Sequence, residues 1–238
     1  GCPISDKGSA DVTFVRHDMA TGLCSIQSNT NVTRLLSNST GRITGVEVVN
    51  GDNHAKTNVL KAPVVVLAAG AVETPRLLLN SANATFSKGL ANNNGQVGRN
   101  FMDSLSFVST GIADTSLDSF KGLPADAICW DYNAPNAIPD VVGGCRLTSS
   151  TQEIGLTGSV NYARRIVPGF GASFKQNMRN TLGRALSVSG FAEMLPNEET
   201  RIDLDPKLVD DHGMPIARIK SRLTEADFKR LKFMADKC

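Results

Sequence analysis

The sequence predicts a mixed α/β fold, α+β overall, on three observations. An aliphatic run, Pro63–Leu67, leads through the small residues Ala68, Ala69 and Gly70 into a stretch with helical spacing. Ahead of this run lie short stretches of strand-forming residues, which are separated by a linker rich in turn formers. Near Met102 the composition changes to a mixture of small, polar and apolar residues, as in the strands of an antiparallel sheet.

Length and composition limit the possible classes of protein. The 238 residues suffice for one large or two modest domains, and 41% hydrophobic content is enough for a core. The net charge of +2, from 25 basic and 23 acidic residues, gives no reason to expect nucleic acid or an anionic membrane as partner. No apolar run approaches the roughly 20 residues of a membrane-spanning helix.

The five cysteines predict no metal site. They form no Cys-x-x-Cys pair, and none stands near a histidine at ligand spacing. Cys129 and Cys145 flank a short segment, so they either pair in an oxidising compartment or remain buried free thiols. The sequence leaves both possibilities open.

The first 62 residues predict a small antiparallel meander. The expected elements are a helix within residues 7–21 and strands at Leu23–Gln27, Asn31–Leu36, Arg42–Val49 and Lys56–Ala62. This meander precedes what reads as the last strand of a nucleotide-binding half.

The junction at residues 63–81 is the most informative stretch. Five apolar residues, Pro63–Leu67, predict a strand covered on both faces, and Thr74 and Pro75 suit the cap and first turn of a helix. The small residues between them let a ligand or another backbone come close. A nucleotide at the strand end and simple strand–helix packing are equally compatible with these residues.

The rest of the chain predicts a second sheet and a closing helix. Residues 84–98 read as a loop, and 164–184 as a solvated, partly irregular basic surface, with a lid or a partner contact as the less favoured interpretation. The expected strands lie in Ser104–Asp114, Ile128–Tyr132, Val141–Leu147, Ser187–Leu195 and Ala217–Ser221, and the helix in Glu225–Lys237.

One motif connects this chain to a known family. Gly70–Ser81 resembles the second signature of the glucose-methanol-choline (GMC) oxidoreductases, which runs Gly, small, two free positions, Ser/Thr, Pro, one free, two aliphatics, two free, Ser, Gly. Only the final Gly is missing, and Ala82 stands in its place.

Flanking segments resemble the same family in the same order. They are Gly1-Cys2-Pro3 with Lys7, Asn31–Leu35, Gly41–Val48, Gly95–Asp103, Arg201–Pro206 and Asp211–Pro215. The His that usually follows Asp103 is replaced by Ser104, and residues 110–190 contain little that matches. The resemblance is closest to the sugar and sugar-acid dehydrogenase branch.

The resemblance implies two partial domains. Residues 1–103 would be part of an FAD-binding, Rossmann-like domain, although no Gly-x-Gly-x-x-Gly unit occurs in them. Residues 104–238 would be part of a substrate-binding and C-terminal domain with an antiparallel sheet, without the family's catalytic His segment. We therefore expect an internal piece of a longer enzyme that is inactive by itself.

The resemblance also implies a function and a cofactor site. Family members are FAD enzymes that oxidise the CH–OH groups of alcohols or sugars by hydride transfer to flavin N5. The Val32 backbone would face adenine, and Ala68, Ala69 and Gly70 would pass close to the ADP moiety. The dehydrogenase type is favoured over the oxidase type, and the electron acceptor is not identified.

No catalytic residue is assigned in this chain. His17, His54 and His212 are its three histidines, and none of them matches the family's catalytic His. His17 falls in an expected helix, whereas His54 and His212 fall in expected exposed turns.

Two other functions are considered. Ala82 and Ser104, which depart from the family pattern, suit a non-catalytic α/β module that binds FAD or another ligand. Flavin absorbance that no alcohol bleaches would be its signature. A nicotinamide-dependent enzyme needs a Gly-x-Gly-x-x-Gly unit with an acidic residue about 20 positions further on, and the sequence has neither.

Overall fold

The computed structural model describes residues 8–51, 57–118, 127–150 and 159–238. The chain divides into two compact units, one formed by Gly1–Gly98 with Ile202–Arg218 and the other by Arg99–Arg201 with Ile219–Cys238. Each unit is described by itself. No helix within the described part of the chain is long and apolar enough to cross a membrane.

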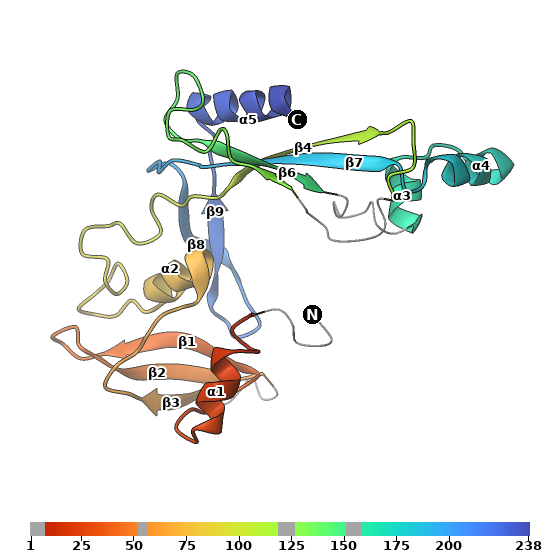
Figure 1. The fold of residues 1–238 in the computed structure, drawn as a ribbon. Helices are drawn as coiled ribbons and strands as arrows, with labels where there is room; N and C mark the ends of the chain where they lie inside the picture. The colour runs from red at the N-terminus through yellow and green to blue at the C-terminus, as the bar shows by residue number, and fades with distance from the viewer. Residues whose placement is uncertain (1–7, 52–56, 119–126, 151–158) are drawn as a thin grey trace. The chain divides into compact units, whose positions relative to one another are not determined.

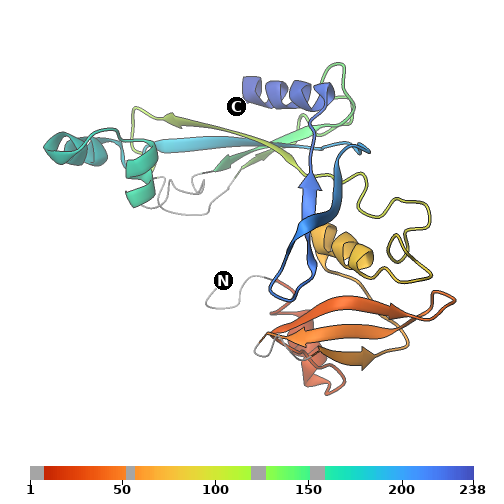
Figure 2. The ribbon, with the colours of Figure 1, turned by 180° about the vertical axis from the view of Figure 1, so that it is seen from behind.

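The first unit contains a three-stranded antiparallel sheet in the order β1-β2-β3 (Figure 2). The strands are β1 Thr30–Ser37, β2 Ile43–Asn50 and β3 Thr57–Lys61. Leu35, Val48 and Val49 are buried. Because Val48 and Val49 are neighbours in β2 and point to opposite faces, apolar side chains are buried on both faces of the sheet. The predicted meander is thereby confirmed, with strand ends within about two residues of those expected.

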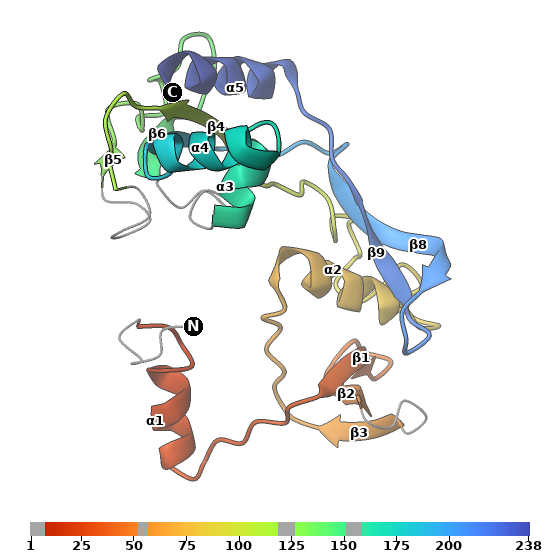
Figure 3. The ribbon, with the colours of Figure 1, turned by 90° about the vertical axis from the view of Figure 1, so that its right-hand side faces the viewer.

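Helix α2 (Gly70–Asn80) lies beside β1 and the β8–β9 pair (Figures 1 and 3). The buried Ser81 hydroxyl accepts a hydrogen bond from the Leu35 backbone N–H at 2.9 Å and donates one to the Leu77 carbonyl at 2.6 Å. The signature serine therefore attaches the end of α2 to strand β1.

Three local predictions for the first unit are wrong. Residues 63–67 form no strand with any described segment, and Val64 and Val66 are 75% and 82% exposed. An extended backbone becomes a strand only when a neighbour satisfies its hydrogen bonds, and the described residues provide none here. Leu23–Gln27 is not a strand either, and the helix begins at Gly70, which leaves Pro75 in its interior.

Strands β8 (Arg201–Val209) and β9 (Pro215–Lys220) form an antiparallel pair, mostly within the first unit. Gly98 lies against β8, because its carbonyl accepts from the Ile202 N–H at 2.7 Å. A Cβ on Gly98 would stand 2.1 Å from the Ile202 carbonyl oxygen, and the φ of +81° also favours glycine. Within the Gly95–Asp103 motif, this glycine therefore allows close backbone contact.

The second unit is built on a four-stranded antiparallel sheet in the order β4-β7-β6-β5 (Figure 1). Its strands are β4 Leu105–Ile112, β7 Ala185–Ala192, β6 Cys145–Ser150 and the short β5 Ile128–Cys129. Four of the predicted strands are confirmed here with shifted ends. Cys129 and Cys145 are both free thiols.

Helix α5 (Glu225–Lys237) packs on one face of this sheet (Figure 3). Met234 is fully buried against Gly190, where a Cβ would come within 2.9 Å of the methionine sulfur. Thr224 and Asp227 close a capping box at the helix start. This helix has the bounds that the sequence predicts.

The remaining helices are short and largely exposed. Helix α1 spans Phe14–Ala20 in the first unit, and α3 (Ser159–Arg165) and α4 (Gly171–Thr181) belong to the second. Tyr162 of α3 is buried and donates its hydroxyl to the Thr181 carbonyl at 2.5 Å. The predicted solvated, partly irregular surface at residues 164–184 contains the end of α3 and the exposed helix α4, with irregular backbone between them.

Candidate functional site

A cavity of about 610 Å³ in the first unit brings together three of the four predicted cofactor residues. Val32, Ala68 and Ala69 all line it. The rest of its wall is mainly aliphatic and comes from β1, β2, β3, Ala62, residues 64–67 and, on helix α2, Glu73 and Leu77. This volume falls within the range of about 300–1,000 Å³ that is usual for ligand sites.

Gly70, the fourth predicted residue, is the first residue of α2 and is not part of the cavity wall. Its φ of +82° is a conformation that side chains other than glycine rarely adopt. A Cβ built on it would meet no described atom within 4 Å. The backbone turn, and not tight packing against a described neighbour, therefore explains glycine at this position.

Among the strands that the structure describes, β1 pairs with β2 alone and is therefore an edge strand. Val32 lies in this strand next to a β-bulge, and its side chain is 43% exposed. Edge strands present backbone N–H and C=O groups that no sheet neighbour uses. Such groups can bind the polar edge of a planar base.

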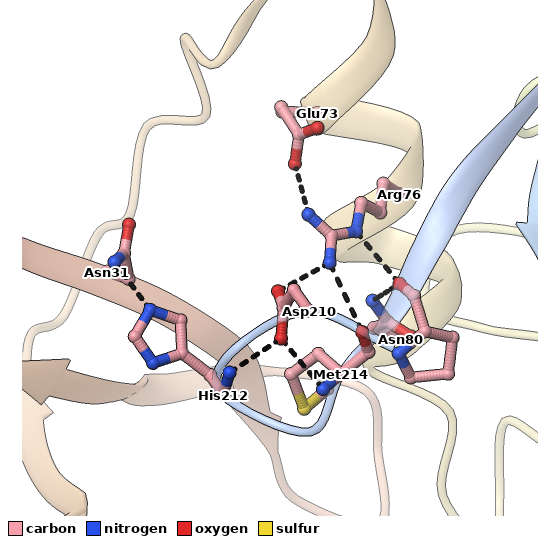
Figure 4. A network of polar contacts seen from close by, with 8 residues as sticks. Asn31, Glu73, Arg76, Asn80, Asp210, His212 and Met214 are labelled. Atoms are coloured by element: carbon pink, nitrogen blue, oxygen red, sulfur yellow. Dashed lines mark hydrogen bonds and ion pairs between the residues drawn. The ribbon is translucent and has the colours of Figure 1, made fainter. Parts of the chain in front are cut away.

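A polar network lies next to this cavity and is centred on Arg76 of α2 (Figure 4). Its guanidinium donates to Asp210 at 2.6 Å, to Glu73 at 3.0 Å and to the Pro215 carbonyl at 2.9 Å. The Arg76 side chain is only 16% exposed. These contacts hold α2 on the turn that joins β8 and β9.

Asp210 organises that turn. One of its oxygens accepts the backbone N–H groups of His212 and Met214, each at 2.9 Å, while the other accepts from Arg76. Burial by itself raises the pKa of Asp210, but the Met214 amide and the Arg76 guanidinium outweigh burial. The pKa of Asp210 therefore lies below its ordinary value of 3.8.

His212 is half-buried and not freely exposed as the sequence suggested. Its Nε2 lies 2.7 Å from Nδ2 of Asn31, the residue before Val32 (Figure 4). His17 is exposed on α1, and His54 lies outside the described residues. Within the described residues, no group of three or more His, Cys, Asp or Glu side chains is placed to hold a metal ion.

We expect Asp210→Asn to destabilise the first unit by about 1–2 kcal/mol at neutral pH, because a charged hydrogen bond to Arg76 is lost at a partly exposed position. A carboxylate whose pKa is lower in the folded than in the unfolded state stabilises the fold at pH values above its unfolded pKa. This contribution disappears as the pH falls through the folded pKa. Wild-type stability should therefore decline below about pH 4, and the variant should lack this part of the decline. Urea unfolding across pH measures both effects.

The matched control is Asp211→Asn, since Asp211 is the exposed neighbour in the same turn. It should leave the stability at neutral pH unchanged. Equal behaviour of the two variants would contradict the role given to Asp210.

The Arg76–Asp210 pair was not singled out from the sequence. Arg76 occupies a free position of the Gly70–Ser81 signature, and Asp210 is 134 residues away in the chain. The only local signal was the turn composition Asp-His-Gly ahead of β9. The Gly1-Cys2-Pro3 and Lys7 motif lies outside the described residues.

Comparison with known proteins agrees with the motifs. Residues 1–106 match the family model described as GMC oxidoreductase. The chain is 28% identical over 200 residues to a 2-methyl-1,2-propanediol dehydrogenase from Mycolicibacterium austroafricanum, an alignment that covers 83% of this chain and 36% of that protein. It is 26% identical over 192 residues to the fructose dehydrogenase large subunit from Gluconobacter japonicus, covering 79% and 34%. The chain thus spans about a third of the length of the curated relatives it matches.

The resemblance recognised from the motifs is confirmed by this match over residues 1–106 and by the similarity of the chain to the two dehydrogenases.

Proposed function

We propose that this chain is part of an FAD-dependent dehydrogenase that oxidises CH–OH groups of alcohols or sugars. The single observation that carries the proposal is that Val32, Ala68 and Ala69, selected from the sequence, line one cavity next to the start of α2. The names of both relatives, a diol dehydrogenase and a fructose dehydrogenase, support a polyhydroxylated substrate and the dehydrogenase type. Residues 1–103 would belong to the cofactor domain and 104–238 to the substrate domain.

The cavity suits the adenosine part of FAD. Its aliphatic wall can cover the faces of a planar base, and the β1 edge at Val32 can hydrogen-bond to its rim. The first backbone N–H groups of α2, an 11-residue helix, have no partner within the helix and favour an anionic group. Ala68, Ala69 and Gly70 would then let the ADP moiety approach the backbone closely.

FAD supplies the hydride acceptor when it is bound, and the residues of this chain would position it. Val32 would orient the adenine, and the network around Arg76 would hold α2 and β1 in place on either side of the base. We assign no general base in this chain, because neither described histidine matches the family's catalytic position.

Binding of FAD to the chain tests the proposal. We expect FAD to bind in equilibrium dialysis and ADP to displace it, because the adenosine half fills the Val32 cavity. FMN lacks adenosine and should not compete. Absence of both FAD and ADP binding, or equal competition by FMN, would contradict the assigned site.

A further inference from the structure

Charged residues are distributed unevenly along the chain. Residues 159–184 contain no Asp or Glu, although the whole chain has 23 acidic residues. Five basic residues lie in this segment, namely Arg164, Arg165, Lys175, Arg179 and Arg184. The net charge of +2 for the whole chain therefore conceals a segment with a local charge of +5. We call residues 159–184 the α3–α4 segment, after the two helices that they contain.

The α3–α4 segment lies at one end of the sheet in the second unit, where β4 ends and β7 begins (Figures 1 and 2). Its attachment is apolar, because Phe174 and Met178 of α4 pack against a buried cluster made of Tyr162, Val167 and Ala185. The Arg184 carbonyl also accepts the Ala113 backbone N–H at 2.9 Å. The segment thus has its own small core, which is distinct from the cluster beneath α5.

The exposed cations of α3 and α4 have no acidic partner. Arg164, Lys175 and Arg179 are exposed, and none of them forms an ion pair with a carboxylate in the part of the chain that the structure describes. Lys175 and Arg179 stand four positions apart on α4 and therefore share one side of the helix. Like charges at this spacing repel each other. An anionic surface would relieve this repulsion.

A large apolar side chain precedes the cations of α4. Phe170 comes directly before this helix and is 89% exposed. It lies between Gly169 and Gly171, whose φ angles of +102° and +71° are ones that other residues rarely adopt. A Cβ on either glycine would meet no described atom within 4 Å, so the turn projects from the unit instead of packing on it. Val160 of α3 is likewise 70% exposed.

We propose that the α3–α4 segment docks the protein on an anionic lipid bilayer. Arg164, Lys175 and Arg179 bind the headgroup phosphates, and Phe170 enters the acyl layer beneath them. Exposed cations next to an exposed aromatic side chain are typical of segments that lie in a membrane interface. A bilayer offers negative charge above an apolar layer, and this order suits the segment better than the polar surface of an acidic protein. The inference goes beyond the proposed function and does not depend on it, because it uses only residues of the second unit.

Flotation with lipid vesicles tests the docking, because bound protein rises with the vesicles whereas aggregated protein sinks. The probes are vesicles of phosphatidylcholine with about 30% phosphatidylglycerol and vesicles of phosphatidylcholine alone. We expect the full chain to float with the anionic vesicles and to bind the neutral ones at least about tenfold more weakly. Raising the salt concentration from about 0.1 M to about 1 M should release it, because the Debye length falls from about 10 Å to about 3 Å. Equal binding to both kinds of vesicle, or none to the anionic kind, would overturn the proposal.

Lys175→Gln combined with Arg179→Gln tests the cations. Each cation near an anionic surface contributes about fivefold in affinity, so the double variant should lose at least about tenfold. Lys229→Gln combined with Lys232→Gln is the matched control, since it removes the same charge from exposed positions of α5 in the same unit. The control should bind the anionic vesicles as the wild type does. Equal losses in the two double variants would show an attraction without a defined site and contradict the role of the α3–α4 segment.

Phe170→Ser separates a bilayer from an acidic protein as the partner. This variant keeps every charge, and we expect it to lose about fivefold or more in vesicle affinity because the apolar contact is removed. Phe228→Ser removes a 60% exposed phenylalanine from α5 and should leave vesicle binding unchanged. Circular dichroism checks that all the variants remain folded. If Phe170→Ser binds the vesicles as well as the wild type does, the proposal is overturned, and tight binding of soluble polyglutamate would then indicate an acidic protein.

Discussion

Arg230→Met is expected to lower the free energy of unfolding of the second unit by about 3–5 kcal/mol. The Arg230 side chain is fully buried, and Nη1 pairs with Asp227 Oδ1 at 2.9 Å. Its other nitrogens donate to the Val142 carbonyl, from Nε at 3.1 Å and also from Nη2. Methionine fills a similar volume but leaves the buried Asp227 charge and this carbonyl without their donor.

The variant should be measured by urea unfolding of the whole chain, followed through a signal from the second unit. Arg222→Met is the matched control, because its ion pair with Glu199 is largely exposed, with side chains 71% and 62% accessible. We expect the control to cost less than about 1 kcal/mol. A loss at Arg230 no larger than that at Arg222 would show that the buried pair does not stabilise α5 on the sheet.

A double variant separates the loss of packing from the cost of a buried charge. Asp227→Asn combined with Arg230→Met removes the uncompensated charge, and Asn can still accept the 2.7 Å bond from the Thr224 backbone N–H. We therefore expect the double variant to be more stable than Arg230→Met alone, a non-additive result typical of contacting residues. If the double variant loses as much stability as the two single variants together, the uncompensated charge of Asp227 is not the cause of the loss in Arg230→Met.

Ala69→Phe is expected to weaken FAD binding by about tenfold to a hundredfold, because overfilling a site by a large side chain costs on the order of 1–3 kcal/mol. Ala69 lines the predicted cofactor cavity and is exposed in this structure. Its φ of −85° suits any residue, so phenylalanine at this position should cause no backbone strain. Stability should change by less than about 0.5 kcal/mol, as at other exposed sites.

Equilibrium dialysis with FAD and with ADP measures this effect, and thermal unfolding checks the fold. Ala84→Phe, in an exposed loop outside the cavity, adds the same ring and should leave FAD binding unchanged. Gly70→Ala is a poorer test, because the φ of +82° at Gly70 makes any side chain strain the helix start. Unchanged FAD affinity in Ala69→Phe would remove Ala69 from the cofactor site.

Much of the local structure was predictable from nearby residues. The β1–β3 strands were predicted from strand-forming stretches around a linker of turn formers, and α5 was expected at Glu225–Lys237, where the structure adds a capping box. Val32, Ala68, Ala69 and Gly70 were predicted as a set from the sequence, and the first three line one cavity. The family motif carried that information, whereas composition alone left packing and ligand binding equally open.

Other features depended on residues far apart in the chain. Residues 63–67 have the composition of a buried strand, yet no described segment pairs with them, and hydrophobicity alone does not supply a partner. Residues 202–218 return to the first unit, and only this return brings Asp210 to Arg76 and His212 to Asn31. Nothing in either segment indicates the other.

The sequence by itself determined the resemblance to the family, the strands of the first sheet, the closing helix and the identity of the residues expected around a cofactor. These depend on local spacing, turn chemistry and a contiguous motif, each of which is encoded within a few residues. Only the tertiary structure decided that α2 begins at Gly70, that Arg76 pairs with Asp210, and that Arg230 donates to the Val142 carbonyl. These arrangements depend on strand register and on hydrogen bonds between residues far apart in the chain. Such a bond forms where a distant backbone group or charge has no other partner.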